Sequence, residues 1–192
     1  IDDYPHQFSG GMQQRAIIAL ALFLEPSLVI ADEPTTALDV IMQDQIFKHL
    51  VEMKADLDTS LLLITHDISV IFESCDSVAI MHASQIAEKG RTEAVYQNPR
   101  HPYAFMFKEA FPDIREPKRE LEVIEGYPPE LMGDVDFCSF VDRCPWAVDE
   151  CYSAEPAHEQ VDDDDETHTV GCFRKDNAYE QYVSEQTSPD PA

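Results

Sequence analysis

The chain has 192 residues, of which 44% are hydrophobic, so it has enough apolar side chains for one large domain or two small ones. Its 38 acidic residues outnumber 13 basic ones and give a formal net charge of −25, which excludes direct binding to nucleic acid at ordinary ionic strength. Because the acidic residues are spread along the chain, we interpret them as adaptation to a high-salt cytoplasm. No apolar stretch reaches the roughly 18 residues that a membrane span needs, and no basic and apolar leader begins the sequence, so we expect a soluble protein.

The first hundred residues alternate between helical and strand patterns. Ser9 precedes two glycines and an apolar helical repeat that Pro26 ends, so it is a candidate helix cap. The apolar runs 28–31 and 60–65 predict strands buried on both faces, and the run 16–24 predicts a buried helix. This alternation indicates a parallel α/β sheet. The remaining elements that we predict are helices at 40–56 and 68–73 and strands at 77–81 and 86–89.

The composition changes after Asn98, where prolines become frequent and where four of the five cysteines lie. We therefore expect a domain boundary near residue 98, which separates 1–98 from an extension at 99–176 and a polar tail at 177–192. Because the extension has few aliphatic side chains, we expect a structural staple in it. Its predicted segments are a short helix at 101–111, an extended linker at 116–129 and a small irregular unit at 137–173.

Two adjacent carboxylates, Asp32 and Glu33, end the first predicted strand. This pair suits metal-assisted phosphoryl transfer, because one carboxylate can hold Mg²⁺ while the other aligns or deprotonates the attacking water. The helix start at Gly10 and Gly11 has backbone N–H groups that an anion can approach closely. No Gly-x-x-x-x-Gly-Lys-Ser/Thr phosphate loop occurs in the 192 residues, so we do not expect this chain to hydrolyse ATP alone.

Four short motifs between residues 8 and 67 resemble, in type and in order, the C-terminal part of an ABC-type ATPase domain. The resemblance implies an α/β fold of the P-loop ABC type, a parallel sheet with flanking helices, followed by a small irregular Cys-rich extension. One motif alone would be weak, but four in the family's order and spacing leave little room for coincidence. The matching segments are 8–12 (FSGGM) for the signature, 30–33 (IADE) for Walker B, 37–39 (ALD) for the D-loop and 64–67 (ITHD) for the H-switch.

The resemblance implies a role for each motif in binding and hydrolysing ATP. Asp32 would hold Mg²⁺ through water, Glu33 would polarise the attacking water, and His66 would contact the γ-phosphate. The signature would close over ATP held by a second ABC ATPase subunit, and Asp39 would connect the two sites. The residues implied to bind that nucleotide in trans are Ser9, Gly10, Gly11 and Met12.

Structural interpretations of these residues stay open at this point. The hydroxyl of Ser9 can simply cap a helix, the two carboxylates can form a solvated turn, and His66 can be a helix-start residue. We expect residues 13–15 to position the signature rather than to touch phosphate. The chain departs from the family because it lacks the Walker A phosphate loop and the Q-loop, which indicates a fragment or a gene that has lost activity. The start at Ile1, just before the signature, favours a fragment.

Four cysteines in the second half are separated by five, six and twenty residues. With His-Pro-Tyr at 101–103 and Pro-Pro-Glu-Leu at 128–131, this array resembles the C-terminal extension of ATP-binding subunits in the oligopeptide and dipeptide permease group. The resemblance implies a [4Fe-4S] cluster, which four soft thiolates can hold. Zn²⁺ is the main alternative, although structural zinc sites usually pair their cysteines more closely, and four unrelated buried thiols are another. The four cysteines are Cys138, Cys144, Cys151 and Cys172.

The same resemblance implies an ATP-binding subunit that couples ATP hydrolysis to the import of di- or oligopeptides. Its implied partners are a second ABC ATPase subunit, transmembrane permease subunits and, indirectly, an external solute-binding protein. Its implied location is cytoplasmic, at the inner face of the cell membrane. Alternatives are an importer of nickel or another solute in the same group, an iron-sulfur interaction domain with a vestigial ATPase half, and a soluble ABC ATPase acting on nucleic acid, which the acidic charge disfavours.

Overall fold

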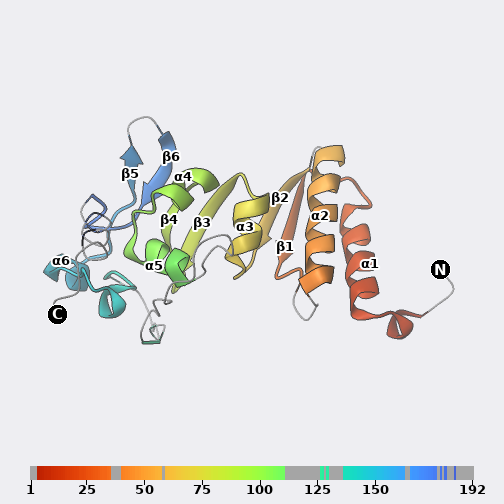
Figure 1. Ribbon diagram of the computed structural model, residues 1–192, viewed down its shortest axis with the longest axis horizontal. Helices are drawn as coiled ribbons and strands as arrows, with labels where there is room; N and C mark the ends of the chain where they lie inside the picture. Colours follow the sequence, from red (N-terminus) through yellow and green to blue (C-terminus); the bar gives the residue numbers. More distant parts are fainter. Residues whose placement is uncertain are drawn as a thin grey trace. The chain divides into compact units, whose positions relative to one another are not determined.

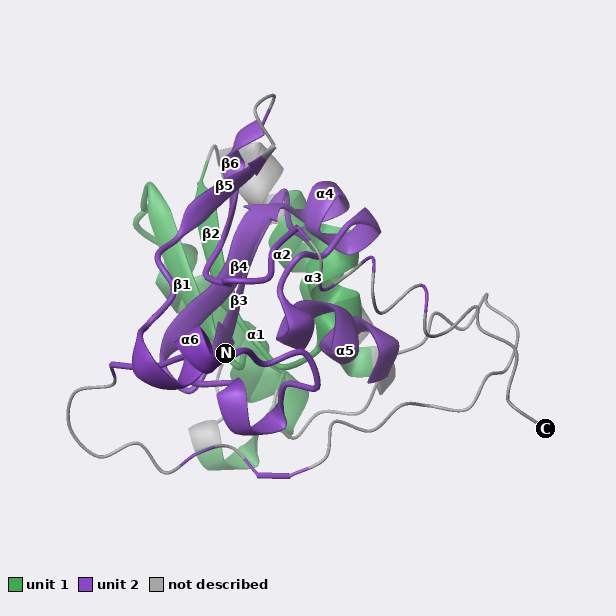
Figure 2. Cartoon of the chain, turned by 90° about the vertical axis from the view of Figure 1, so that its left-hand side faces the viewer, with its two compact units in different colours: residues 1–74 green, residues 75–192 purple. Residues whose placement is uncertain are grey.

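The computed structural model shows a chain with helices and strands along most of its length (Figure 1). Contacts within the chain divide it into two compact units, Ile1–Ser74 and Cys75–Ala192 (Figure 2). In the part of the chain that the structure describes, we find no helix whose length and hydrophobicity would let it span a bilayer. The described residues are 4–35, 40–57, 59–110, 126, 127, 129, 136–162, 165–176, 178, 180 and 184.

The first unit combines a two-stranded sheet with helices. Its elements are η1 (Pro5–Gln7), α1 (Gly10–Leu22), β1 (Leu28–Asp32), α2 (Val40–Leu57), β2 (Ser60–Ile64) and α3 (Ile68–Ser74). β1 and β2 are parallel, with Leu28 opposite Ser60 and Asp32 opposite Ile64. The predicted order of helices and strands and the parallel pairing are therefore confirmed in this unit.

The core of the first unit lies on one face of the β1–β2 sheet. Buried side chains of α2 pack against Leu61 and Leu63 of β2. Because successive strand residues point to opposite faces, Leu62 and Ile64 lie on the other face, where they are 49% and 48% exposed. The prediction of strands buried on both faces is therefore wrong for the described residues. The α2 residues of this core are Ile46, Phe47 and Leu50.

The helix α1 begins at Gly10, as the sequence predicts, and ends at Leu22, two residues short of the predicted end at Leu24. Ile18 packs against the α2 core, while Ile17 and Leu20 are 60% and 75% exposed. The prediction of a buried helix is therefore wrong, because in the described residues Ile18 packs against α2 while its apolar neighbours stay exposed.

The second unit is built on an antiparallel sheet with the strand order β3-β4-β6-β5. A two-residue turn at Ala83 and Ser84 joins the first two strands, and both residues have the positive φ, 45° and 67°, that such tight hairpins need. The elements of the unit are β3 (Ser77–His82), β4 (Gln85–Arg91), α4 (Thr92–Gln97), α5 (Pro102–Ala110), η2 (Val141–Arg143), α6 (Asp149–Ser153), β5 (Glu159–Asp162) and β6 (Asp165–Val170).

The second unit crosses the boundary that we expected near residue 98. β4 pairs with β6 of the extension, with Glu88 opposite Val170. The ring of Phe105 in α5, which confirms the helix expected at 101–111, packs edge-on against Trp146 with centroids 5.1 Å apart. The compact units therefore divide at residues 74 and 75 instead, because strand pairing, together with the packing of the His82 ring against Phe140, joins the two sides of residue 98. The linker expected at 116–129 and the polar tail lie almost entirely outside the described residues.

Candidate functional site

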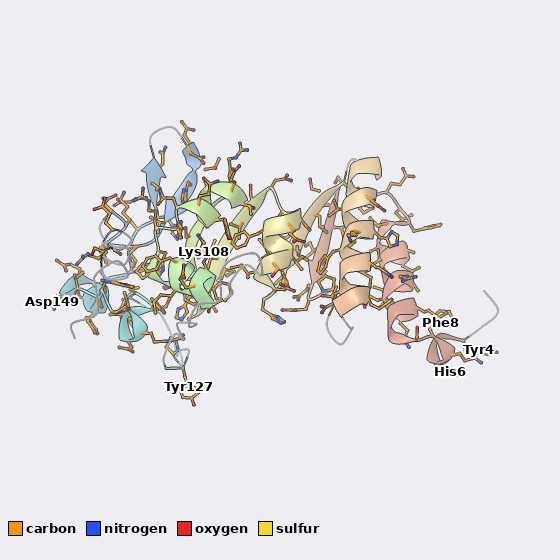
Figure 3. All side chains as sticks on the ribbon, in the orientation of Figure 1. Tyr4, His6, Phe8, Lys108, Tyr127 and Asp149 are labelled. Carbon is orange, nitrogen blue, oxygen red and sulfur yellow. The ribbon has the colours of Figure 1, made fainter. Side chains whose placement is uncertain are left out.

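Ser9 stands at the N-cap position of α1, with φ −65° and ψ 160°. Its carbonyl accepts the N–H of Gln13, whereas, among the described residues, its hydroxyl caps no N–H group of the helix. Ser9 and Gly10 are exposed. Just before them the rings of Tyr4 and His6 stack 5.6 Å apart, at the same end of α1 (Figure 3). This helix end therefore offers a hydroxyl and first-turn N–H groups to an anion.

Gly11 is buried where α1 meets α2. A Cβ atom at this position would lie 2.5 Å from Cε of Met42. Because Cε ends a flexible side chain, an alanine here would displace Met42 rather than the backbone. Glycine therefore allows the close packing of the two helices directly below the exposed Gly10.

Glu33 follows β1 directly and has a φ of 45°, in the left-handed region that residues other than glycine rarely occupy. Its N–H donates a hydrogen bond of 2.9 Å to the carbonyl of Ile64, at the end of β2. Backbone strain of this kind persists only where surrounding contacts fix the residue, and it concentrates at functional sites. The conformation of Glu33 thus marks the end of β1 as a candidate catalytic site.

The side chain of Glu33 meets His66, two residues beyond β2. Oε1 of Glu33 lies 2.7 Å from Nδ1 of His66, and the two side chains are 39% and 84% exposed. This hydrogen bond, together with the charge of Glu33, raises the pKa of His66 above its ordinary value. The pair therefore presents to solvent a carboxylate and an imidazole that share a proton.

The structure brings together three of the residues that the sequence singled out. Asp32 is exposed at the carboxyl end of β1, next to Glu33, and His66 follows the neighbouring parallel strand. Ligand-binding groups of α/β sheets gather at this edge. The signature residues form a separate group at the start of α1, where Met12 is half exposed. Asp39 lies outside the described residues.

Two glutamines hold the turn after Glu33, and the sequence analysis did not assign them to it. Nε2 of Gln14 in α1 makes a short hydrogen bond to the carbonyl of Pro34. Nε2 of Gln43 in α2 donates a 3.3 Å hydrogen bond to the carbonyl of Thr35. We expected Gln14 only to support the signature, and no sequence signal marked Gln43, because both contacts depend on how the helices pack against the turn.

The four extension cysteines line one cavity of the second unit, together with aromatic and aliphatic side chains that include Phe140 and Trp146. All are free thiols. The N–H of Cys138 donates to the carbonyl of Cys151 at 2.9 Å, which fixes two of the cysteine backbones against each other. The cavity thus gathers Cys138 and Cys151 with Cys144 and Cys172, as a shared site would require.

Burial raises the pKa of Cys144 and of Cys172 to about 12, and it also raises the pKa of Cys138. Without a bound cation these thiols are therefore protonated at neutral pH. Across the described ranges, no three His, Cys, Asp or Glu side chains are arranged to bind one metal ion. The thiols share a cavity, but they do not converge on a single point.

Comparison with known proteins shows which family the chain resembles. A family model described as "ABC transporter" matches residues 1–36, and one described as "Oligopeptide/dipeptide transporter, C-terminal region" matches residues 87–151. The dipeptide transport ATP-binding protein DppD of Bacillus subtilis is 41% identical over 183 residues, which are 95% of this chain and 54% of that protein. The chain belongs to the oligopeptide/dipeptide family of ABC transporter ATP-binding proteins.

A second relative is similar over a shorter part of the chain. The oligopeptide transport ATP-binding protein OppD of Salmonella typhimurium is 44% identical over 153 residues, 80% of this chain and 46% of that protein. The chain thus spans about half the length of the curated relatives it matches. Among solved structures, cbiO1 of Clostridium perfringens, part of the ABC transporter complex cbiONQ, matches with a TM-score of 0.46 and 35% identity, over 48% of this chain and 37% of that one.

The segments matched by the family models contain most of the two sites. Residues 1–36 include the signature at the start of α1 and the pair Asp32 and Glu33. Residues 87–151 include the His-Pro-Tyr segment and three of the four cysteines. The matched segments therefore overlap the turn after β1 and the thiol cavity, whereas His66 and Cys172 lie outside them.

Proposed function

We propose that this chain is the signature and Walker B part of an ATP-binding subunit that drives the import of di- or oligopeptides. The observation that carries the proposal is the 2.7 Å hydrogen bond between Glu33 and His66 at the end of two parallel strands. It supplies a carboxylate for the attacking water and an imidazole for the γ-phosphate on one exposed edge. The names of the relatives, which are dipeptide and oligopeptide transport proteins, support peptides as the solute.

In the proposed reaction, Glu33 aligns the water and takes up its proton as the water oxygen bonds to the γ-phosphorus. The bond between that phosphorus and the bridging oxygen breaks, so that ADP and phosphate leave. His66 donates a hydrogen bond to the γ-phosphate, which its raised pKa favours. The exposed carboxylate of Asp32 is a hard oxygen donor that fits Mg²⁺ through water. When bound there, Mg²⁺ would supply positive charge to neutralise the phosphates.

The signature acts on a different nucleotide in this proposal. The free hydroxyl of Ser9 and the N–H groups of Gly10 and Gly11 would contact the γ-phosphate of ATP held by a second ABC ATPase subunit. α1 has 13 residues, so the partial positive charge at its N-terminus adds to this attraction. The D-loop residue Asp39 would connect the two nucleotide sites. Each subunit thus completes the other's site.

The same proposal includes the partners and the location. ATP binding would close the two ATPase subunits, and this movement would act on transmembrane permease subunits that receive peptide from an external solute-binding protein. The subunit would therefore work in the cytoplasm at the inner face of the membrane. The net charge of −25 supports a cytoplasm of high salt, because counterions then screen the self-repulsion of the protein.

For the thiol cavity we propose a [4Fe-4S] cluster held by Cys138, Cys144, Cys151 and Cys172, with Zn²⁺ as the alternative. Four free thiols around one partly apolar cavity suit a soft metal group. A single Zn²⁺ needs all sulfurs about 2.3 Å from one point, whereas a cluster takes one thiolate on each iron and tolerates wider spacing. When bound, the group would join η2, α6 and the segment after β6, which share little aliphatic core.

The proposal is tested in the complete ATP-binding subunit, with its phosphate loop and permease. We expect Glu33→Gln to lower ATP turnover by at least about 100-fold while ATP still binds, because the water loses its base. Glu73→Gln, on the exposed side of α3, is the matched control and should turn over ATP like the wild type. Uptake of a labelled dipeptide should stop in Glu33→Gln. Uptake of nickel, the alternative solute, should be the same in the variant and in the wild type. Undiminished turnover in that variant would contradict the proposal.

A further inference from the structure

The turn that follows β1 is held from three sides. The N–H of the strained residue Glu33 donates to Ile64 of β2, Gln14 of α1 donates to the carbonyl of Pro34, and Gln43 of α2 donates to the carbonyl of Thr35. A non-glycine residue at φ 45° keeps that conformation only when its surroundings fix it. These hydrogen bonds therefore hold the backbone from which the side chain of Glu33 extends toward His66.

The contact from Gln14 differs from the other two because of where α1 begins. Gln14 lies in the second turn of the helix that Ser9 caps and Gly10 starts, about 7 Å along the axis from Ser9. The glutamine is twenty residues from Pro34 in sequence, and its hydrogen bond crosses from the signature helix to the catalytic turn. A single rigid helix thus joins the signature to the backbone beside Glu33.

We infer that Gln14 is a positioning residue that couples the signature of a subunit to the catalytic carboxylate of the same subunit. The inference rests on the proposed function, in which the signature contacts ATP held by the partner and Glu33 acts on the subunit's own ATP. When the signature closes on the partner's γ-phosphate, α1 carries the amide of Gln14 with it. That amide sets the position of the Pro34 carbonyl and so of Glu33. ATP binding at one nucleotide site thereby changes the position of the catalytic carboxylate at the other.

Packing around Gln14 supports a rigid link rather than a flexible one. Gly11, one turn before Gln14, lies so close to α2 that Met42 occupies the space of a side chain. Arg15, the next residue, donates to Oε1 of Gln45 in α2 at 3.3 Å. α1 therefore contacts α2 both before and after Gln14, and because a regular helix is stiff over one or two turns, a displacement of the signature moves this part of α1 with it.

The kinetic test compares two matched substitutions in the complete ATP-binding subunit. Gln14→Met keeps the length of the side chain and removes the donor, and we expect kcat to fall about tenfold with KM for ATP within about twofold of wild type. Gln97→Met makes the same change at an exposed glutamine of α4 whose hydrogen bond to Glu93 stays within its own helix, and it should leave both constants unchanged. Gln14→Glu, which keeps the shape without the donor, replaces Gln14→Met if that variant unfolds. A wild-type kcat in both Gln14 variants would overturn the inference.

A second readout needs no ATPase activity. In the chain described here, NMR titration of His66 should give a lower pKa in Gln14→Met than in wild type, because a looser turn weakens the hydrogen bond that His66 donates to Glu33 and that raises this pKa. Gln97→Met should titrate like wild type. If the complete subunit hydrolyses no ATP and His66 still responds to Gln14→Met, the proposed function fails and the positional link stands. An unchanged His66 overturns the link itself.

Discussion

His168 of β6 donates a hydrogen bond of 2.7 Å from Nε2 to Oε1 of Glu88 in β4, in the interior of the second unit. The side chains are 5% and 0% exposed. The carboxylate of Glu88 also accepts the backbone N–H groups of Arg100 and His101 at 2.7 to 3.0 Å. One buried carboxylate thus ties the extension's last strand and the start of the His-Pro-Tyr segment to β4.

Removal of that carboxylate should strongly destabilise the second unit. Glu88→Ala leaves two backbone donors and the ring of His168 buried without an acceptor, and we expect the free energy of unfolding to fall by about 3–5 kcal/mol. Urea unfolding followed by circular dichroism measures this change. Glu159→Ala is the control, because Glu159 is 62% exposed in its ion pair with Lys175 and should cost at most about 1 kcal/mol. Equal losses in the two variants would show that Glu88 is not an anchor.

Ser9→Ala should separate a capping role from a functional one. An N-cap serine that bonds its helix typically contributes about 1 kcal/mol, but the hydroxyl of Ser9 makes no such bond in the described residues. We therefore expect an unchanged midpoint of thermal unfolding and a large loss of ATP turnover in the complete subunit. Asp67→Ala is the comparison for stability, since Oδ1 of Asp67 accepts the N–H of Ser69 at the start of α3. A lower midpoint in Ser9→Ala would assign the hydroxyl to the helix.

The stability of the second unit should decrease in mild acid. Burial lowers the pKa of His82 to about 4 and that of His101 to about 3, whereas both have values near 6.5 in the unfolded chain. Between these values the unfolded chain binds more protons, so the free energy of unfolding falls as pH drops below about 6.5. Urea unfolding at about pH 7.5 and about pH 5 measures the slope.

The control for this prediction is a histidine on the surface. His82→Gln should flatten the dependence on pH, because the residue whose charging is suppressed by burial is gone. His49→Gln should leave the slope as it is in the wild type, since the side chain of His49 is 60% exposed. The prediction fails if the slope of His82→Gln matches that of the wild type.

The local elements of the first unit could be predicted from the sequence because breakers and apolar runs define them. Pro26 separates α1 from β1, and the continuous apolar run after Ser60 gives β2 within one residue of its observed end. The burial of these elements could not be predicted. Whether Ile30 or Leu20 is covered depends on which other elements pack there, and in this structure both are mostly exposed.

The contacts that join distant segments had no local signal. β6 has the polar sequence DETHTV and pairs with β4, and its buried His168 bonds to Glu88, which lies eighty residues earlier in the chain. The candidate site shows the same contrast. Asp32 and Glu33 could be predicted as a site because two adjacent carboxylates follow an apolar run. The hydrogen bond from Gln14 to the carbonyl of Pro34 could not be predicted, because it forms only when α1 packs beside the turn. Sequence thus predicts the reactive groups better than the residues that position them.

The thiol cavity should contain iron when the protein is purified without oxygen. We expect visible absorbance and about four iron atoms per chain, held by the thiols that line the cavity. Cys144→Ser should lose iron and lower the midpoint of thermal unfolding, because the metal group joins segments with little shared core. Cys75→Ser is the matched control, since Cys75 lies outside the residues that line this cavity, and it should keep wild-type absorbance. Zinc in place of iron would select the alternative metal, and a colourless protein with neither would remove the metal from the proposed function.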